Sequence, residues 1–182
     1  MKQKTSGLQA DFAPIRDEGT RITICYGLTK AKGKLYEWWE IYLPKKQNAQ
    51  LNLQMVKDAI IADINARTDE KIVGGLVWTP QAGGYPIPVW LSTENQFNFK
   101  SAYDLAVQKQ GATLPVTFKM GEDEEGNPVY HTFETMDDAD DFYLHAMAYI
   151  KTTLAAGWSE KDSIDWTPYE EYFHKNDNNS QE

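Results

Sequence analysis

The spacing of apolar residues along the chain predicts both strands and helices. Period-two alternation, bounded by turn residues, predicts antiparallel hairpins at about 20–43, 76–91 and 114–134. Apolar residues three and four positions apart predict three main helices at about 53–67, 98–110 and 136–156. Hairpins and helices with apolar faces must bury those faces against one another. The pattern therefore predicts an α+β fold.

Polar residues ahead of the helical stretches indicate where the helices begin. Asn52 is a plausible N-cap, with Leu51 and Val56 spaced as a hydrophobic staple. The next helix has two possible caps, Ser92 with Asn95 or Thr93 with Gln96. Thr135 and Asp138 have the spacing of a capping box for the third helix, and Gly157 is expected to end it.

Strand alternation places the neighbouring residues Trp38 and Trp39 on opposite faces of the first hairpin. One ring can fill a core, so the other needs a helix, a partner or a ligand over it. Aromatic residues make up 13% of the chain, an excess that fits either a core built on rings or an interaction surface. The core is the simpler interpretation.

Charge and composition exclude several classes of function. A formal net charge of −9 argues against binding nucleic acid, which requires a cationic surface. The N-terminal residues contain no apolar segment of the kind found in signal peptides, and no apolar run has the length of about 20 residues that a membrane helix needs. Cys25, the only cysteine, lies in a strand pattern and is expected to be a buried, unreactive thiol.

No motif predicts catalysis, a metal site or a cofactor. His131, His145 and His174 are far apart in sequence, and neither acidic cluster has the spacing of a calcium loop. These clusters, 122–125 and 137–141, are typical of a solvated turn and of a charged helix start. An enzyme would need a pocket in which at least two of four residues meet: His131, His145, Glu134 and Asp141.

Several segments together resemble a known family. They are Val89-Trp-Leu-Ser-Thr-Glu-Asn-Gln-Phe-Asn-Phe-Lys-Ser-Ala-Tyr103, Leu114-Pro-Val-Thr-Phe118, Tyr130-His-Thr-Phe133 and Gly157-Trp-Ser-Glu-Lys-Asp-Ser-Ile-Asp-Trp166. The likeness, over about 74–173, is to an uncharacterised domain family of bacteriophage and prophage proteins from gut Bacteroidales. That resemblance implies a tail-associated virion component or an assembly factor, by analogy alone. It transfers no functional residue.

The resemblance divides the chain into four expected segments. These are an N-terminal arm (1–19), a hairpin plus helix (20–73), the phage-associated domain of unknown function (74–173) and a polar tail (174–182). We expect a protein of the host bacterial cytoplasm, or one incorporated into the virion. Its expected partners are other phage structural proteins or further copies of itself.

The candidate interaction surface consists of aromatic residues. They are Trp38, Trp39, Trp78, Tyr85 and Trp90. An alternative function is an accessory domain that binds bacterial surface glycans, because exposed rings stack on sugar rings. The candidates for stacking lie near the Pro/Gly-rich loop, and they are Trp78, Tyr85, Trp90 and Tyr103. The competing interpretation is that these rings pack beneath the loop.

Overall fold

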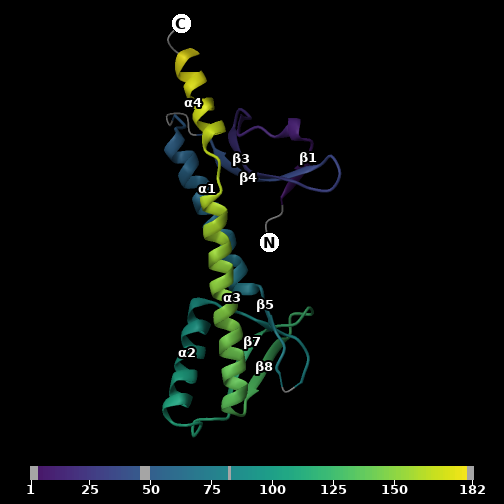
Figure 1. Cartoon of the computed structure of the whole chain (residues 1–182), viewed down its shortest axis with the longest axis vertical. Helices are drawn as coiled ribbons and strands as arrows, with labels where there is room; N and C mark the ends of the chain where they lie inside the picture. The colour runs from purple at the N-terminus through teal and green to yellow at the C-terminus, as the bar shows by residue number, and fades with distance from the viewer. Residues whose placement is uncertain (1–3, 46–49, 82, 180–182) are drawn as a thin grey trace. The chain divides into compact units, whose positions relative to one another are not determined.

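The structure is a computed structural model that describes residues 4–45, 50–81 and 83–179. Its helices and antiparallel strands confirm the predicted α+β fold (Figure 1). The chain forms two compact units, here called unit 1 (Met1–Arg67 and Trp158–Glu182) and unit 2 (Thr68–Gly157). The predicted boundary at residue 74 lies near this division, whereas 158–173, predicted to continue the preceding domain, groups with unit 1.

Unit 1 contains a four-stranded antiparallel sheet in the order β1-β4-β3-β2. Its strands are β1 (Thr5–Gly7), β2 (Ile15–Asp17), β3 (Arg21–Lys30) and β4 (Tyr36–Pro44). The central pair is the predicted 20–43 hairpin. The segment predicted as an N-terminal arm supplies β1, a short 3-10 helix (Gln9–Asp11) and β2, so two of its stretches are strands of the sheet. Residues 1–3 lie outside the described part.

The two faces of this sheet are covered differently. Ile24 and Tyr26 of β3 pair with Ile41 and Trp39 of β4, and this face packs on the helices of unit 1. The opposite face carries Trp38, which meets Phe12 edge to face with ring centroids 6.0 Å apart. The predicted opposition of Trp38 and Trp39 follows from this alternation.

Helices α1 (Leu53–Gly74) and α4 (Thr167–Asn179) contribute to the core of unit 1. Val56, Ile60 and Ile64 of α1 recur every fourth residue and are fully buried. From α4, the Tyr169 hydroxyl donates to the Cys25 carbonyl oxygen at 2.6 Å. The α4 helix extends into the segment predicted as a polar tail, of which residues 180–182 lie outside the described part.

Arg67 connects the sheet of unit 1 to two of its helices. Its guanidinium donates to Asp63 of α1 (3.2 Å), to the Tyr26 hydroxyl of β3 (2.9 Å) and to Glu160 of α3 (2.7 Å). The Tyr26 hydroxyl in turn donates to Asp63 at 2.6 Å. The guanidinium carbon also lies 3.9 Å from the ring centroid of Trp39, a cation–π contact.

Unit 2 is built from two hairpins, the helices α2 and α3, and the C-terminal end of α1 from Thr68 onward. Its elements are β5 (Leu76–Trp78), β6 (Ile87–Val89), α2 (Thr93–Gln108), β7 (Val116–Glu122), β8 (Pro128–Phe133) and most of α3 (Met136–Asp162). The β5–β6 and β7–β8 hairpins match the predicted ranges 76–91 and 114–134. The Trp90 amide donates to the Met120 carbonyl at 2.7 Å and so joins the hairpins. Helices α2 and α3 lie side by side in this unit (Figure 1).

Three of the predicted helix caps are present. The Asn52 side chain accepts from the Met55 amide (2.9 Å), Ser92 from the Asn95 amide (3.2 Å) and Thr135 from the Asp138 amide (3.3 Å). Helix α1 continues beyond its predicted end at 67, and α3 continues beyond Gly157. Among the described residues, no helix combines the length and apolar character that crossing a membrane requires.

The predicted helix stop at Gly157 is wrong, and packing within unit 2 explains the glycine. A Cβ atom at position 157 would lie 2.5 Å from Oγ1 and 3.1 Å from Cγ2 of Thr68 on α1. The glycine therefore allows α3 to approach α1 closely at this point. A contact between residues so distant in sequence leaves no local signal, so a helical glycine was mistaken for a terminal one.

The Arg67 network predicts how unit 1 responds to loss of this charge. We expect Arg67→Met to lower the free energy of unfolding by about 3 kcal/mol, since the half-buried Asp63 carboxylate loses its cationic partner. Arg67→Lys keeps the charge but cannot serve the three acceptors in the same geometry, so its loss should be intermediate. Hydrogen exchange resolved to the amides of unit 1 measures both; equal protection in wild type and Arg67→Met would contradict the prediction.

Candidate functional site

The rings predicted to form an interaction surface are exposed to very different extents. Trp38 is 2% exposed and Trp78 is 1% exposed, so both belong to the packed interior. Trp39 is half-buried beneath Arg67. Trp90 is 38% exposed, and the ammonium of Lys119 lies 5.0 Å from its ring centroid. Tyr85 is 90% exposed, which leaves almost its whole ring free to contact a partner.

Trp78 is buried because unit 2 has a core of aromatic rings. The ring packs edge to face on His131 and Phe142, with centroids 4.9 Å and 5.1 Å away, and lies 6.0 Å from Phe133. Its indole N–H donates to the carboxylate of Asp141 at 3.0 Å, which satisfies the polar atom inside the core. This packing explains why Trp78 does not contribute to the predicted surface.

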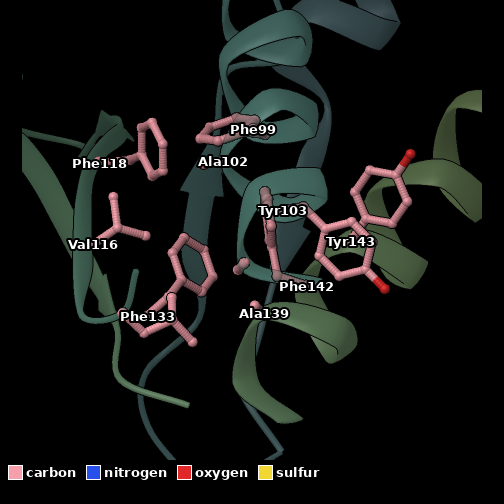
Figure 2. Close-up of a pocket in the computed structure, with 11 residues that line it drawn as sticks. Phe99, Ala102, Tyr103, Val116, Phe118, Phe133, Ala139, Phe142 and Tyr143 are labelled. Atoms are coloured by element: carbon pink, nitrogen blue, oxygen red, sulfur yellow. The ribbon is translucent and has the colours of Figure 1, made fainter. Parts of the chain in front are cut away.

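A small aromatic pocket lies in the same unit, between α2, α3 and the β7–β8 hairpin. Figure 2 shows Phe99 and Tyr103 of α2 facing Phe142 and Tyr143 of α3, with Phe118 on the strand side. Tyr103 and Tyr143 stack with an interplanar angle of 7° and centroids 4.2 Å apart. The open volume of about 20 Å³ holds roughly one water molecule, far less than a sugar ring. Tyr103 is therefore engaged in packing.

A larger opening in unit 2 is a cleft beside β8, here called the β8 cleft. It has a volume of about 520 Å³. Three parts of the chain line it: Pro80, Gly83, Gly84, Tyr85 and Ile87 around the start of β6; Val129–Thr132 of β8; and Glu134, Thr135 and Asp138 near the start of α3. This size is typical of sites that bind small molecules or short peptide segments.

The β8 cleft combines exposed rings with acidic groups. Tyr85 and Tyr130, which are 90% and 61% exposed, are its aromatic residues. Its acidic side chains are Glu134 and Asp138, which lie with the imidazole of His131, and none of the described residues that line the cleft is a lysine or an arginine. His131 Nε2 and Asp138 Oδ2 are 2.9 Å apart, so the imidazole is already paired with a carboxylate. The cleft is suited to neutral or cationic ligands.

The four residues considered for an enzyme site fall into two pairs. His131 and Glu134 both line the β8 cleft, so two of the four residues meet in one pocket, which is the condition stated for an enzyme. His145 lies on α3, where its Nδ1 is 2.7 Å from the Asp141 carbonyl oxygen and 3.1 Å from Oδ1 of the same residue. In the part of the chain that the structure describes, no group of three or more His, Cys, Asp or Glu side chains is arranged to hold a metal ion.

A second cleft, of about 510 Å³, lies within unit 1. Its lining includes Lys4, Trp39, Glu160 and Asp165. The ammonium of Lys4 is 5.6 Å from the Trp39 ring centroid, and Glu160 is bound by Arg67. Because its charged and aromatic groups already contact one another, this cleft offers fewer free groups than the β8 cleft.

Glu40 is the most strongly perturbed carboxylate of unit 1, and its surroundings are structural. It accepts from Arg16 (2.7 Å) and the Trp38 indole (3.0 Å) through Oε1, and from the Tyr42 hydroxyl (2.7 Å) through Oε2. Burial alone would raise its pKa, but the hydrogen bonds from Tyr42, Trp38 and Arg16 outweigh burial and lower the pKa to about 2. A carboxylate bound in this way is a poor proton acceptor.

Cys25 lies beside Glu40 in the register of β3 and β4. Its side chain is fully buried, as the sequence predicted. Burial raises the pKa of the thiol to about 11. The reactive thiolate is therefore scarce at neutral pH, consistent with an unreactive residue.

Sequence reasoning missed Tyr130, Thr132 and Asp138 as site residues. Tyr85 drew attention because it sits in a Pro/Gly-rich loop. Tyr130 lies in an ordinary strand pattern. Asp138 is predicted to form a capping box with Thr135, and the structure shows the Asp138 amide donating to the Thr135 hydroxyl. The sequence predicts the hairpin that contains Tyr130 and Thr132. It does not predict that the loop carrying Tyr85 lies near this hairpin.

The depressed pKa of Glu40 predicts acid sensitivity of unit 1. Because the folded-state pKa lies below the ordinary value of 4.5, ionised Glu40 contributes stability above about pH 4.5 that is lost as the pH falls towards about 2. The contribution is about 3 kcal/mol. Denaturant unfolding across this range should show a smaller pH dependence for Glu40→Gln than for wild type, and parallel curves would contradict the assignment.

The comparisons with known proteins identify one family. The family described as a domain of unknown function (DUF4376) matches residues 55–177, which include all of unit 2. No curated protein and no solved structure matches the chain. The match confirms the resemblance to a domain family of unknown function and extends it to residue 55, whereas the phage setting stays a prediction. The chain belongs to the DUF4376 family.

Proposed function

We propose that this protein is a non-enzymatic structural or assembly protein of a bacteriophage or prophage, associated with the tail or fibre, that acts through protein–protein contacts. The phage setting rests on the sequence resemblance of the segments around Trp90, Phe118 and Trp166. The mode of action rests on one observation, the exposed Tyr85 ring at the β8 cleft.

Tyr85 has the properties of an anchor for a protein partner. Tyrosine is enriched at interfaces because it buries a large, rigid ring and still offers a hydroxyl. The ring is 90% exposed, and its chain neighbours are Gly84 and Pro86. Proline at 86 restricts the backbone conformation of Tyr85, whereas Gly84 leaves the preceding backbone free to adjust to a partner.

Two further features favour binding over catalysis. In the β8 cleft, Nε2 of His131 lies 2.9 Å from Oδ2 of Asp138, so this nitrogen is already engaged within the chain. In unit 1, the donors around Glu40 hold it as a carboxylate rather than as a proton carrier. Both arrangements stabilise the structure of this chain.

Replacing the anchor should reduce partner binding without unfolding the protein. We expect Tyr85→Ala to weaken capture of a tail or fibre protein encoded beside its gene by about tenfold or more, the effect typical of an interface anchor. Phe97→Ala is the matched control, since Phe97 is 70% exposed in the same unit but does not line the cleft. Equal losses in both variants, or none in Tyr85→Ala, would overturn the proposal. Native mass spectrometry of the purified protein measures self-association in parallel.

A glycan-binding accessory domain is the second candidate, and the pairing of two exposed tyrosines favours it. Tyr85 and Tyr130 line one cleft with Thr132 and Glu134, whose oxygens can bind sugar hydroxyls. The remaining predicted stacking ring, Trp90, is covered in part by Lys119 and is not among the lining residues.

A glycan array of bacterial surface polysaccharides tests this candidate. If the cleft binds sugars, Tyr85→Ala should lose the signal, because stacking on an aromatic ring contributes on the order of 1 kcal/mol or more. Trp90→Ala should retain the signal. The absence of any signal from wild-type protein would remove this candidate and leave protein–protein contact as the proposal.

A further inference from the structure

The β8 cleft follows the free edge of a strand. Within the described residues, β8 pairs only with β7, so the edge of β8 that faces away from β7 has no strand partner. Successive side chains of a strand point to opposite faces, yet the consecutive residues Val129–Thr132 all line the cleft. The cleft therefore runs along the edge of β8 and not over one face.

An unpaired strand edge is a template for an extended peptide. Its backbone N–H and C=O groups alternate in the direction that an added strand requires. The length of edge provided by Val129–Thr132 is about 13 Å, at roughly 3.3 Å per residue. The exposed Tyr85 lies on the loop before β6 and lines the same cleft as β8. Its ring can therefore contact such a peptide as well.

The charges at the cleft decide which peptide fits. Glu134 and Asp138 line it after β8, and the exposed turn 123–125 precedes β8 with three acidic residues. The nearby Lys119 is neutralised by Glu122 at 2.9 Å. Electrostatic complementarity therefore favours a basic segment and disfavours an acidic one.

The aromatic residues favour the same occupant. Tyr85 and Tyr130 present exposed ring faces, which attract arginine and lysine side chains through cation–π contacts of about 0.5–1 kcal/mol at exposed sites. Arginine suits the cleft best, because its planar guanidinium both stacks on a ring and binds a carboxylate with two hydrogen bonds. Glu134, exposed beside these rings, is the carboxylate in position to accept them.

We propose that the β8 cleft binds a basic, extended segment of a partner protein, which adds as a strand to the edge of β8. The arginine side chains of that segment contact Tyr85, Tyr130 and Glu134. This inference rests on the proposed function, since it names the chemistry of the partner that such contacts would engage.

Fluorescence polarisation with synthetic peptides tests the proposal on the full chain. The probe is a labelled peptide of about ten residues that alternates arginine with valine and threonine, long enough to span the edge. We expect saturable binding that weakens about tenfold or more when alternate backbone amides of the peptide are N-methylated, because N-methylation removes the donors for strand pairing. A matched peptide with glutamate in place of arginine should not bind.

Variants of the protein separate the contributions of the Tyr85 ring and the Glu134 carboxylate to peptide binding. Tyr85→Ala and Glu134→Gln should each lower the affinity for the arginine peptide. Glu134→Gln should also reduce the dependence of that affinity on salt. Phe97→Ala should bind as wild type does, and circular dichroism confirms that every variant is folded. Equal binding of the N-methylated or acidic peptide would overturn the proposal.

The outcome also distinguishes this inference from the proposed function. If Tyr85→Ala abolishes capture of a protein partner but the arginine peptide does not bind wild type, the basic-strand assignment is wrong while the protein–protein function stands. If the peptide binds as expected but partner capture is independent of Tyr85, the proposed function is wrong at this site.

Discussion

The guanidinium of Arg67 joins the sheet of unit 1 to two of its helices, α1 and α3, through polar contacts. It binds Asp63 on its own helix, the Tyr26 hydroxyl on the sheet and Glu160 on α3. A buried or half-buried ion network stabilises little by itself but tolerates few alternative arrangements, because each unpaired charge is costly. The same group lies over Trp39 and so removes from the surface a ring that the sheet alone would leave uncovered. The partial burial of Trp39 therefore depends in part on a charged group.

Local features of the fold were predictable from the sequence, because their causes lie within a few residues. The caps at Asn52, Ser92 and Thr135 depend on side chains that reach amides three positions away. The β1 and β2 strands were missed because their partners are β4 and β3, and their own residues include no clear alternation. These two segments form strands because they pair with β4 and β3, and their own sequences do not show it.

The candidate site was predictable only in part, for the same reason. Glycine and proline around Tyr85 indicate a loop, but the sequence leaves open whether the ring is exposed or packs beneath that loop. The burial of Trp78 depends on His131, Phe133 and Phe142, which belong to two later elements. Tyr130 becomes a site residue only because the loop before β6 lies opposite β8. The spacing of residues along the chain does not predict that this loop lies near β8.

The close approach of Gly157 to Thr68 has a consequence for how sequences of this family can vary. A methyl group at 157 needs space that Thr68 now fills, so the two positions are not free to change independently. A larger residue at 157 is compatible with the same helix packing only if position 68 becomes smaller. Substitutions at positions 68 and 157 should therefore occur together in related sequences, although the two positions are far apart in the chain. Such a correlation would indicate that α1 and α3 pack closely at this point in unit 2.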